Sequence, residues 1–144
     1  MVVQIGNTQG NHRISKRKIQ QSARAILDAL GYPDAELSIL IVDDQQIAKL
    51  NHQYLNREGP TNVIAFSMRQ GQFAEITPQL LGDVVISWDR AVSQGREYGH
   101  GTQRELERLL VHGLLHLFGY DHDTDLEDGD KMREMEDRYL GVHD

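Results

Sequence analysis

The chain has 144 residues, of which 39% are hydrophobic and 26% are charged, and it has no cysteine. These values are typical of one globular domain with a single core, and they exclude disulfides and thiolate metal sites, so histidine and carboxylate are the strong metal ligands that remain. The net charge of -7 argues against a protein that binds nucleic acid through its overall electrostatic field.

The N-terminal segment has no basic region followed by an apolar run, and no stretch approaches the roughly 18 apolar residues of a membrane span. We therefore expect a cytoplasmic protein that does not insert into a membrane. Residues 1–144 are expected to form a single domain, because no repeat, low-complexity tract or linker interrupts the sequence.

The first third of the chain predicts a strand, a helix and a second strand. Residues 2–5 have the residue types of a short strand. Ser15 is the expected N-cap of a helix that runs to about Leu30, with apolar residues at helical spacing on one face, and Gly31 ends this helix. Residues 36–42 form a nearly continuous apolar run rich in β-branched side chains, which predicts a strand buried on both faces.

A second helix is expected to follow directly. Asp43 or Asp44 is placed to cap it, and Ile47, Leu50 and Tyr54 recur at a spacing that puts them on one face.

The middle of the chain predicts two strands around a loop. Residues 62–68 read as the first strand and residues 81–87 as the second. The stretch 69–79 has no periodicity, which indicates a loop of about eleven residues that borders a substrate. A short helix is expected to begin at Ser87 or Asp89.

Two segments have the form of a capping box. The first, Thr102-Gln-Arg-Glu105, is expected to open a long helix that becomes apolar nearly all round and is therefore buried. The second, Thr124-Asp-Leu-Glu127, is expected to open a last helix. The order β-α-β-α-β-β-α-α-α predicts an α/β (α+β) domain with a mixed sheet of about four strands and about five helices.

The stretch from His112 to His122 places three histidines within eleven residues. His112 and His116 are four residues apart, so on a helix their side chains project from one face, one turn apart. Gly119 can end the helix in a left-handed conformation and let the chain turn back, so that His122 reaches the same point. The spacing predicts that the three imidazoles converge on a single point beside the buried helix. The alternative is a helix whose histidines only face a solvent-filled cleft.

Three neutral imidazoles with a fourth position open are the ligand set of a catalytic divalent metal ion, most often zinc, although nickel, copper and iron also accept imidazole. Such an ion lowers the pKa of its bound water to about 7 and can polarise a carbonyl or phosphoryl oxygen. We therefore predict a metal-dependent hydrolase with one divalent ion, zinc being the first candidate.

The same histidine spacing occurs in metzincin peptidases, in which the residue after the first histidine is a glutamate that acts as general base. Here that residue is Gly113. General acid–base catalysis contributes about a hundredfold to ten-thousandfold in rate, so its loss disfavours a peptidase unless Glu105, Asp121 or Asp125 substitutes. A phosphodiester suits the site better, because RNA carries its own 2′-hydroxyl nucleophile and a metal can stabilise the developing charge.

The sequence resembles the YbeY-type endoribonucleases, also called rRNA maturation factors, from about Leu37 to Leu140. The strongest element of the resemblance is the signature from His112 to His122. The weaker supporting blocks are Leu50-Asn-x-x-Tyr54, Pro60-Thr-Asn-Val63, Leu81-Gly-Asp-Val-Val-Ile-Ser87, and Tyr98-Gly-His100 followed by Arg104-Glu-Leu106.

This resemblance implies a zinc-like ion on His112, His116 and His122 and cleavage of single-stranded RNA. It also implies a role in 16S rRNA 3′-end maturation and ribosome quality control, with rRNA and the ribosome or its small-subunit proteins as partners. The oligomeric state stays open.

One position departs from the family pattern. Many members have an arginine directly after the tyrosine that matches Tyr54, and that arginine is thought to support catalysis. Here the position holds Leu55, and Arg57, two residues further on, is the candidate catalytic residue that can present a guanidinium to the same cleft. The alternative for Arg57 is an ordinary solvated loop arginine.

The leading hypothesis is a single-strand-specific metalloendoribonuclease. Two alternatives stay open from the sequence: a zinc metallopeptidase, which the shared histidine spacing motivates, and a non-catalytic ribosome-assembly factor in which the metal only stiffens the fold.

Overall fold

Four strands form one mixed sheet in the computed structural model, which describes residues 2–7, 15–67 and 80–117. The strands are β1 (Val2–Asn7), β2 (Glu36–Val42), β3 (Val63–Ser67) and β4 (Leu80–Ser87). Their order across the sheet is β1-β2-β4-β3, with β1, β2 and β4 parallel and β3 antiparallel to β4. The mixed four-stranded sheet predicted from the sequence is therefore confirmed, and β3 is one of its two outer strands.

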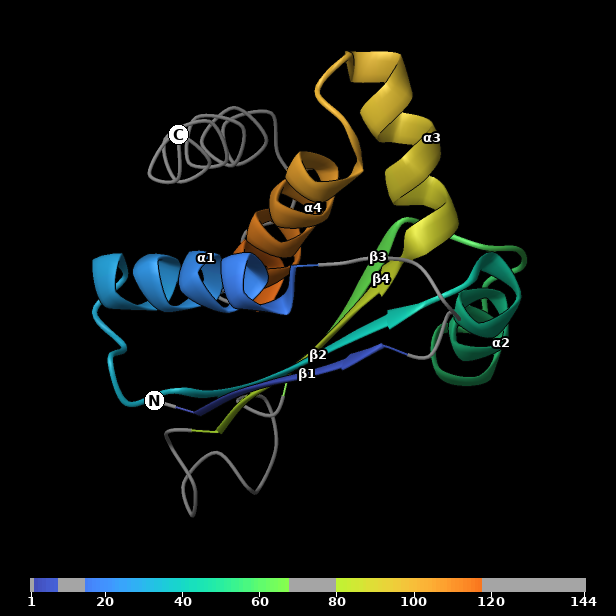
Figure 1. Ribbon diagram of the computed structural model, residues 1–144. Helices are drawn as coiled ribbons and strands as arrows, with labels where there is room; N and C mark the ends of the chain where they lie inside the picture. The colour runs from blue at the N-terminus through green and yellow to red at the C-terminus, as the bar shows by residue number, and fades with distance from the viewer. Residues whose placement is uncertain (1, 8–14, 68–79, 118–144) are drawn as a thin grey trace, which may run out of the picture.

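Four helices surround the sheet: α1 (Lys16–Ala29), α2 (Asp44–Leu55), α3 (Trp88–Tyr98) and α4 (Thr102–Leu117). Helices α1 and α4 lie on one side of the sheet, and α2 packs on the other (Figure 1). The helix expected to begin at Thr124 and the loop expected over 69–79 lie outside the described residues. None of the four described helices combines the length and the apolar character that a membrane crossing requires.

The predicted caps account for the start of three helices. Ser15 and Ser87 each accept a hydrogen bond from the backbone N–H three residues further on, at 3.3 and 3.2 Å. Asp43 is the cap of α2, and it forms a capping box with Gln46 through hydrogen bonds of 2.8 and 3.2 Å. The sequence left Asp43 and Asp44 as alternatives, and the structure selects Asp43.

Asp44 instead ties the start of α2 to the start of α3. Its carboxylate accepts a hydrogen bond from the Ser87 hydroxyl at 2.8 Å, and its backbone N–H donates to the Asp89 carboxylate at 2.8 Å. Because Ser87 ends β4 and Asp44 follows β2, these bonds join the carboxyl ends of two neighbouring parallel strands. They fix the place at which α2 leaves the sheet.

The start of α4 corrects a sequence prediction. Thr102 is the first helical residue instead of the N-cap, and the backbone N–H of Glu105 donates to the Gly101 carbonyl at 3.1 Å. The Glu105 carboxylate binds His100 and Arg108. The predicted capping box is wrong because a buried carboxylate gains more from charge-assisted partners than from a neutral backbone N–H, although the helix does begin where the sequence placed it.

The burial of β2 corrects a second prediction. Leu37, Ile39 and Ile41 point into the core beneath α1 and α4, whereas Ser38 and Leu40, on the other face, are only half-buried. The expectation that both faces are buried is wrong, because α2 leaves directly after β2 and covers only part of its own face of the sheet. The uncovered part borders a pocket that is described below.

Candidate metal centre

Helix α4 carries the two described histidines of the predicted site, and its apolar side chains hold it against the sheet. The members of this buried face are Leu106, Leu109, Leu110, Val111, Leu114, Leu115 and Leu117. His112 and His116 are half-buried, on the flank of that face. The helix is therefore an anchored support that limits how far the two imidazoles can move.

The structure brings His112 and His116 together, as their spacing predicts. Their Nε2 atoms are 3.0 Å apart, and their ring centroids are 4.6 Å apart with an interplanar angle of 61°. Both rings therefore direct the same nitrogen toward a common point, one helical turn apart.

The donor set of this pair fits a divalent metal ion. Two nitrogens bound to one zinc ion at about 2.1 Å and at the tetrahedral angle are about 3.4 Å apart, so the rings need to separate by only a few tenths of an ångström. Without an ion, the same distance suits a hydrogen bond from one neutral imidazole to the other. The geometry thus accommodates a metal ion with little rearrangement of α4.

The predicted third ligand, His122, lies outside the described residues. Over residues 2–7, 15–67 and 80–117, no group of three or more histidine, aspartate or glutamate side chains is placed to hold a metal ion. A three-histidine site therefore stays a prediction, of which the structure describes one pair.

Gly113 faces the sheet. It lies between the two histidines, and it is the position at which this chain departs from the peptidase pattern. A Cβ at this position would lie 2.7 Å from Cγ1 of Val84 and 3.1 Å from Cγ2 of Val63. These distances are too short for carbon atoms in van der Waals contact, for which about 3.5–4.0 Å is normal. The helix therefore approaches β3 and β4 as closely as it does because residue 113 has no side chain.

The first turns of α4 hold a buried charged network on the same flank as the histidines. The Glu105 side chain is fully buried, and its carboxylate oxygens lie 2.7 Å from Nε2 of His100 and 2.7 and 2.6 Å from two nitrogens of Arg108. The Arg108 guanidinium also lies 5.0 Å from the centre of the Tyr98 ring. Because Arg108 precedes His112 by one turn, this network places a paired cation next to the predicted metal ligands.

The sequence anticipated part of this network. Helical spacing puts Glu105 and Arg108 on the same side of α4 as His112 and His116, and the structure confirms this, but the sequence assigns no partner to His100. A carboxylate inside an apolar helix must be paired, and Arg104 and His100 are the two ionisable side chains that precede it most closely in the sequence. The sequence therefore indicates that Glu105 is paired, whereas the turn that brings His100 to Glu105 is seen only in the structure.

Arg57 lies on a separate part of the fold. Asn56 ends α2 in a left-handed conformation, with φ of 52°, and the backbone N–H of Arg57 donates to the Asn51 carbonyl at 3.2 Å. The Arg57 side chain is exposed and forms no hydrogen bond or ion pair with another described residue. Since α2 and α4 pack on opposite faces of the sheet, the described structure does not join Arg57 to the histidine pair.

A family model and several named proteins match most of the chain. Residues 4–143 match the family model described as Endoribonuclease YbeY. Proteins named Endoribonuclease YbeY from Geobacter metallireducens and Geobacter sulfurreducens are 43% and 44% identical to the chain over 140 residues, which cover 97% of this chain and 93% of each relative. The relative of the same name from Aquifex aeolicus is 44% identical over 128 residues, or 89% of this chain and 83% of that protein.

The fold also matches a solved structure. The solution structure of TM1509 from Thermotoga maritima aligns with a TM-score of 0.67 over 99% of this chain and 89% of that chain, at 20% sequence identity. At this identity the match supports the α+β architecture alone.

Proposed function

Because the chain belongs to the Endoribonuclease YbeY family, we propose that it is a single-strand-specific metalloendoribonuclease that acts in 16S rRNA 3′-end maturation and ribosome quality control. The structural observation that carries the proposal is the 3.0 Å approach of the His112 and His116 Nε2 atoms on a buried helix. The proposed setting is the cytoplasm, with single-stranded rRNA as substrate and the ribosome or its small-subunit proteins as partners.

The proposed cofactor is one divalent ion, zinc being the first candidate, held by His112, His116 and His122. When bound, such an ion supplies Lewis-acid stabilisation of a phosphoryl oxygen and lowers the pKa of water. The chain itself orients the two imidazoles of α4 and keeps one side of the pair dry through the leucine-rich core. The 2′-hydroxyl of RNA is then available as a nucleophile that the protein does not have to provide.

The packing of Gly113 supports a nuclease over a peptidase. The Cβ direction at residue 113 points between Val84 and Val63, so this position cannot present a general base to a substrate. Glu105, one of the substitutes considered from the sequence, is already engaged by His100 and Arg108. The described residues thus offer no carboxylate that is placed like the base of a metzincin.

The function is tested by metal analysis of the purified protein together with cleavage assays on single-stranded RNA, duplex RNA and casein. We expect about one divalent ion per chain and cleavage of single-stranded RNA only, which chelation abolishes and zinc restores. Casein turnover with intact RNA would favour the peptidase, and a folded, metal-loaded protein without hydrolytic activity would favour the assembly factor.

We further propose Arg57 as a residue that binds the substrate phosphate. Its exposed guanidinium has no partner among the described residues and suits a phosphate geometrically. Arg57→Ala should lower the rate of RNA cleavage roughly tenfold to a hundredfold, with Arg57→Lys intermediate. Arg24→Ala, on the exposed face of α1, is the matched control, and equal rates for the Arg57→Ala and Arg24→Ala proteins would show that Arg57 is only a solvated loop residue.

A further inference from the structure

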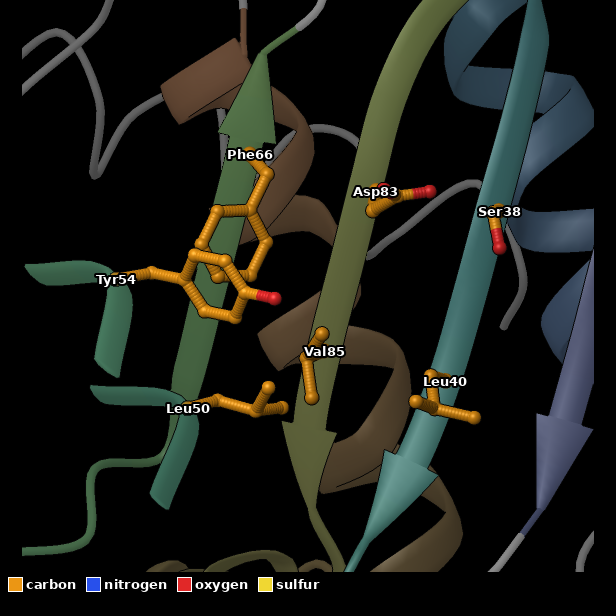
Figure 2. Close-up of a pocket in the computed structure, with 7 residues that line it drawn as sticks. All are labelled: Ser38, Leu40, Leu50, Tyr54, Phe66, Asp83 and Val85. Carbon is orange, nitrogen blue, oxygen red and sulfur yellow. The ribbon is translucent and has the colours of Figure 1, made fainter. Parts of the chain in front are cut away.

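A pocket of about 470 Å³ lies on the face of the sheet that carries α2, away from α4 (Figure 2). Its floor is made by side chains of β2 and β4, and its walls come from α2 and β3. The lining residues are Ser38, Leu40, Leu50, Tyr54, Phe66, Asp83 and Val85. This volume lies within the range of about 300–1,000 Å³ that is usual for pockets that hold small molecules.

One wall of the pocket is aromatic and open to solvent. Tyr54 and Phe66 meet edge to face, with ring centroids 5.5 Å apart and an interplanar angle of 72°. Tyr54 is 61% exposed, which is unusual for a large side chain that borders an apolar pocket. An aromatic ring that keeps one face accessible is a platform on which a planar group can stack.

The floor of the pocket adds two polar side chains. Ser38 and Asp83 are register partners on β2 and β4, so they lie side by side, as Figure 2 shows. Within the described ranges, neither side chain forms a hydrogen bond or an ion pair with another residue. Asp83 therefore presents a carboxylate, which only accepts hydrogen bonds, beside a hydroxyl that donates or accepts.

We propose that this pocket binds one base of single-stranded RNA and that it prefers guanine; the proposal rests on the nuclease function proposed above. An aromatic wall suits a stacked base, and the Asp83 carboxylate suits the hydrogen-bond donors on the edge of that base. The same carboxylate repels phosphate, so the base enters the pocket and the RNA backbone stays outside.

Guanine fits the Asp83 carboxylate because two of its hydrogen-bond donors are adjacent. Its N1–H and its exocyclic amino group lie next to each other and can both donate to one carboxylate. Adenine, cytosine and uracil each present one donor beside an acceptor, and that acceptor would face the negative charge of Asp83. Asp83 is therefore the residue that selects the base, and Tyr54 is the residue that binds any base.

The pocket and the histidine pair lie on opposite faces of β3 and β4. The side chains of Val84 and Val63 face α4, whereas those of Val85 and Phe66 face the pocket. An RNA strand that reached both places would pass around β3, which is the outer strand on that side of the sheet among the described residues.

The test uses 2′-O-methyl RNA hexamers of uridine that carry guanine, inosine, adenine or uracil at one central position. These oligomers lack the 2′-hydroxyl, so cleavage through that nucleophile is blocked while binding is measured by NMR titration of the full chain. We expect the guanine hexamer to bind roughly tenfold more tightly than the adenine and uracil hexamers. Inosine, which keeps N1–H but lacks the amino group, should lose most of that advantage.

Two variants separate selection from stacking. Asp83→Asn should remove the preference for guanine, because an amide can present its own N–H group to the guanine donors. Tyr54→Ala should instead weaken the binding of all four hexamers roughly tenfold. Tyr54→Phe keeps the ring and should bind like the native protein. Asp28→Asn, an exposed carboxylate of α1 outside the pocket, is the matched control for the charge change.

Equal affinity for the four hexamers, or a guanine preference that survives Asp83→Asn, would overturn the proposal. Equal affinity for the four hexamers is the result expected if the pocket instead binds an apolar side chain of a protein partner. If the native protein cleaves single-stranded RNA but shows no preference for guanine, the proposed base pocket is wrong and the proposed nuclease function stands. If the protein binds the guanine hexamer selectively but cleaves no RNA, the proposed nuclease function is wrong and the proposed base pocket stands.

Discussion

Replacing His112 or His116 by alanine should lower the rate of RNA cleavage by about a thousandfold or more and should remove the bound metal ion. The two Nε2 atoms converge at 3.0 Å, so the loss of either imidazole removes half of the donor pair that α4 supplies. Both side chains lie on the flank of the helix and not among its buried leucines. The thermal melting temperature of each metal-free variant should therefore remain close to that of the metal-free native protein.

The matched control is His52→Ala, which removes an exposed histidine from the last turn of α2. This variant should keep the native metal content and the native rate. Metal content is measured by elemental mass spectrometry, and cleavage is measured on a labelled single-stranded RNA. Native activity in a His112→Ala protein that carries no metal would refute the metal centre, whereas loss of activity with full metal content would place these histidines in substrate binding.

The local features of the fold could be predicted from sequence because they depend on nearby residues. Ser15 and Asp43 cap their helices through hydrogen bonds to backbone N–H groups three residues away. The proximity of His112 and His116 likewise follows from the helical repeat alone. Each of these predictions needs only the type of the element and the order of the residues within it.

Features that depend on the packing of distant elements were not predictable in this way. The apolar composition of β2 suggested a strand covered on both faces, but the bonds of Asp44 to Ser87 and Asp89 direct α2 away from part of the sheet. The pocket that results joins Ser38 to Asp83, which are 45 residues apart in the numbering and become neighbours only through the register of β2 and β4. No periodicity in the sequence indicates which part of a sheet a helix leaves uncovered.

Gly113 belongs to both kinds of feature. From the sequence, residue 113 is the position at which the general base of a peptidase is absent, and its neighbours in the chain do not indicate a role in packing. In the structure the same residue allows α4 to approach Val84 and Val63. One position therefore carries a chemical consequence and a packing consequence, and a substitution there tests both.

Gly113→Glu should prevent stable folding and should not create a peptidase. The new side chain would start 2.7 Å from Cγ1 of Val84, a fully buried residue, and would carry an unpaired carboxylate into the core. Burial of an unpaired charge costs several kcal/mol, against a total stability of about 5–15 kcal/mol for a domain. Urea unfolding followed by circular dichroism should show little or no folded protein.

Gly113→Ala isolates the steric part of this effect. Overpacking costs about 1–3 kcal/mol, whereas the exchange of glycine for alanine in a helix gains about 0.5–1 kcal/mol, so the expected net result is destabilisation by about 1–2 kcal/mol. Val84 is β-branched and lies between β2 and β3 in the sheet, so it cannot move aside as a flexible side chain would. The clash should therefore outweigh the gain in helix propensity.

A double-mutant cycle with Val84→Ala assigns the cost to this contact. Val84→Ala removes the Cγ1 atom that the new methyl group would meet, so the double variant Gly113→Ala/Val84→Ala should be more stable than the sum of the two single effects predicts, by about 1 kcal/mol. If Gly113→Ala raised the free energy of unfolding and the two effects simply added, the close approach of α4 to β4 would not be what requires glycine. The absence of a base at residue 113 would then have to be explained by the chemistry of the site alone.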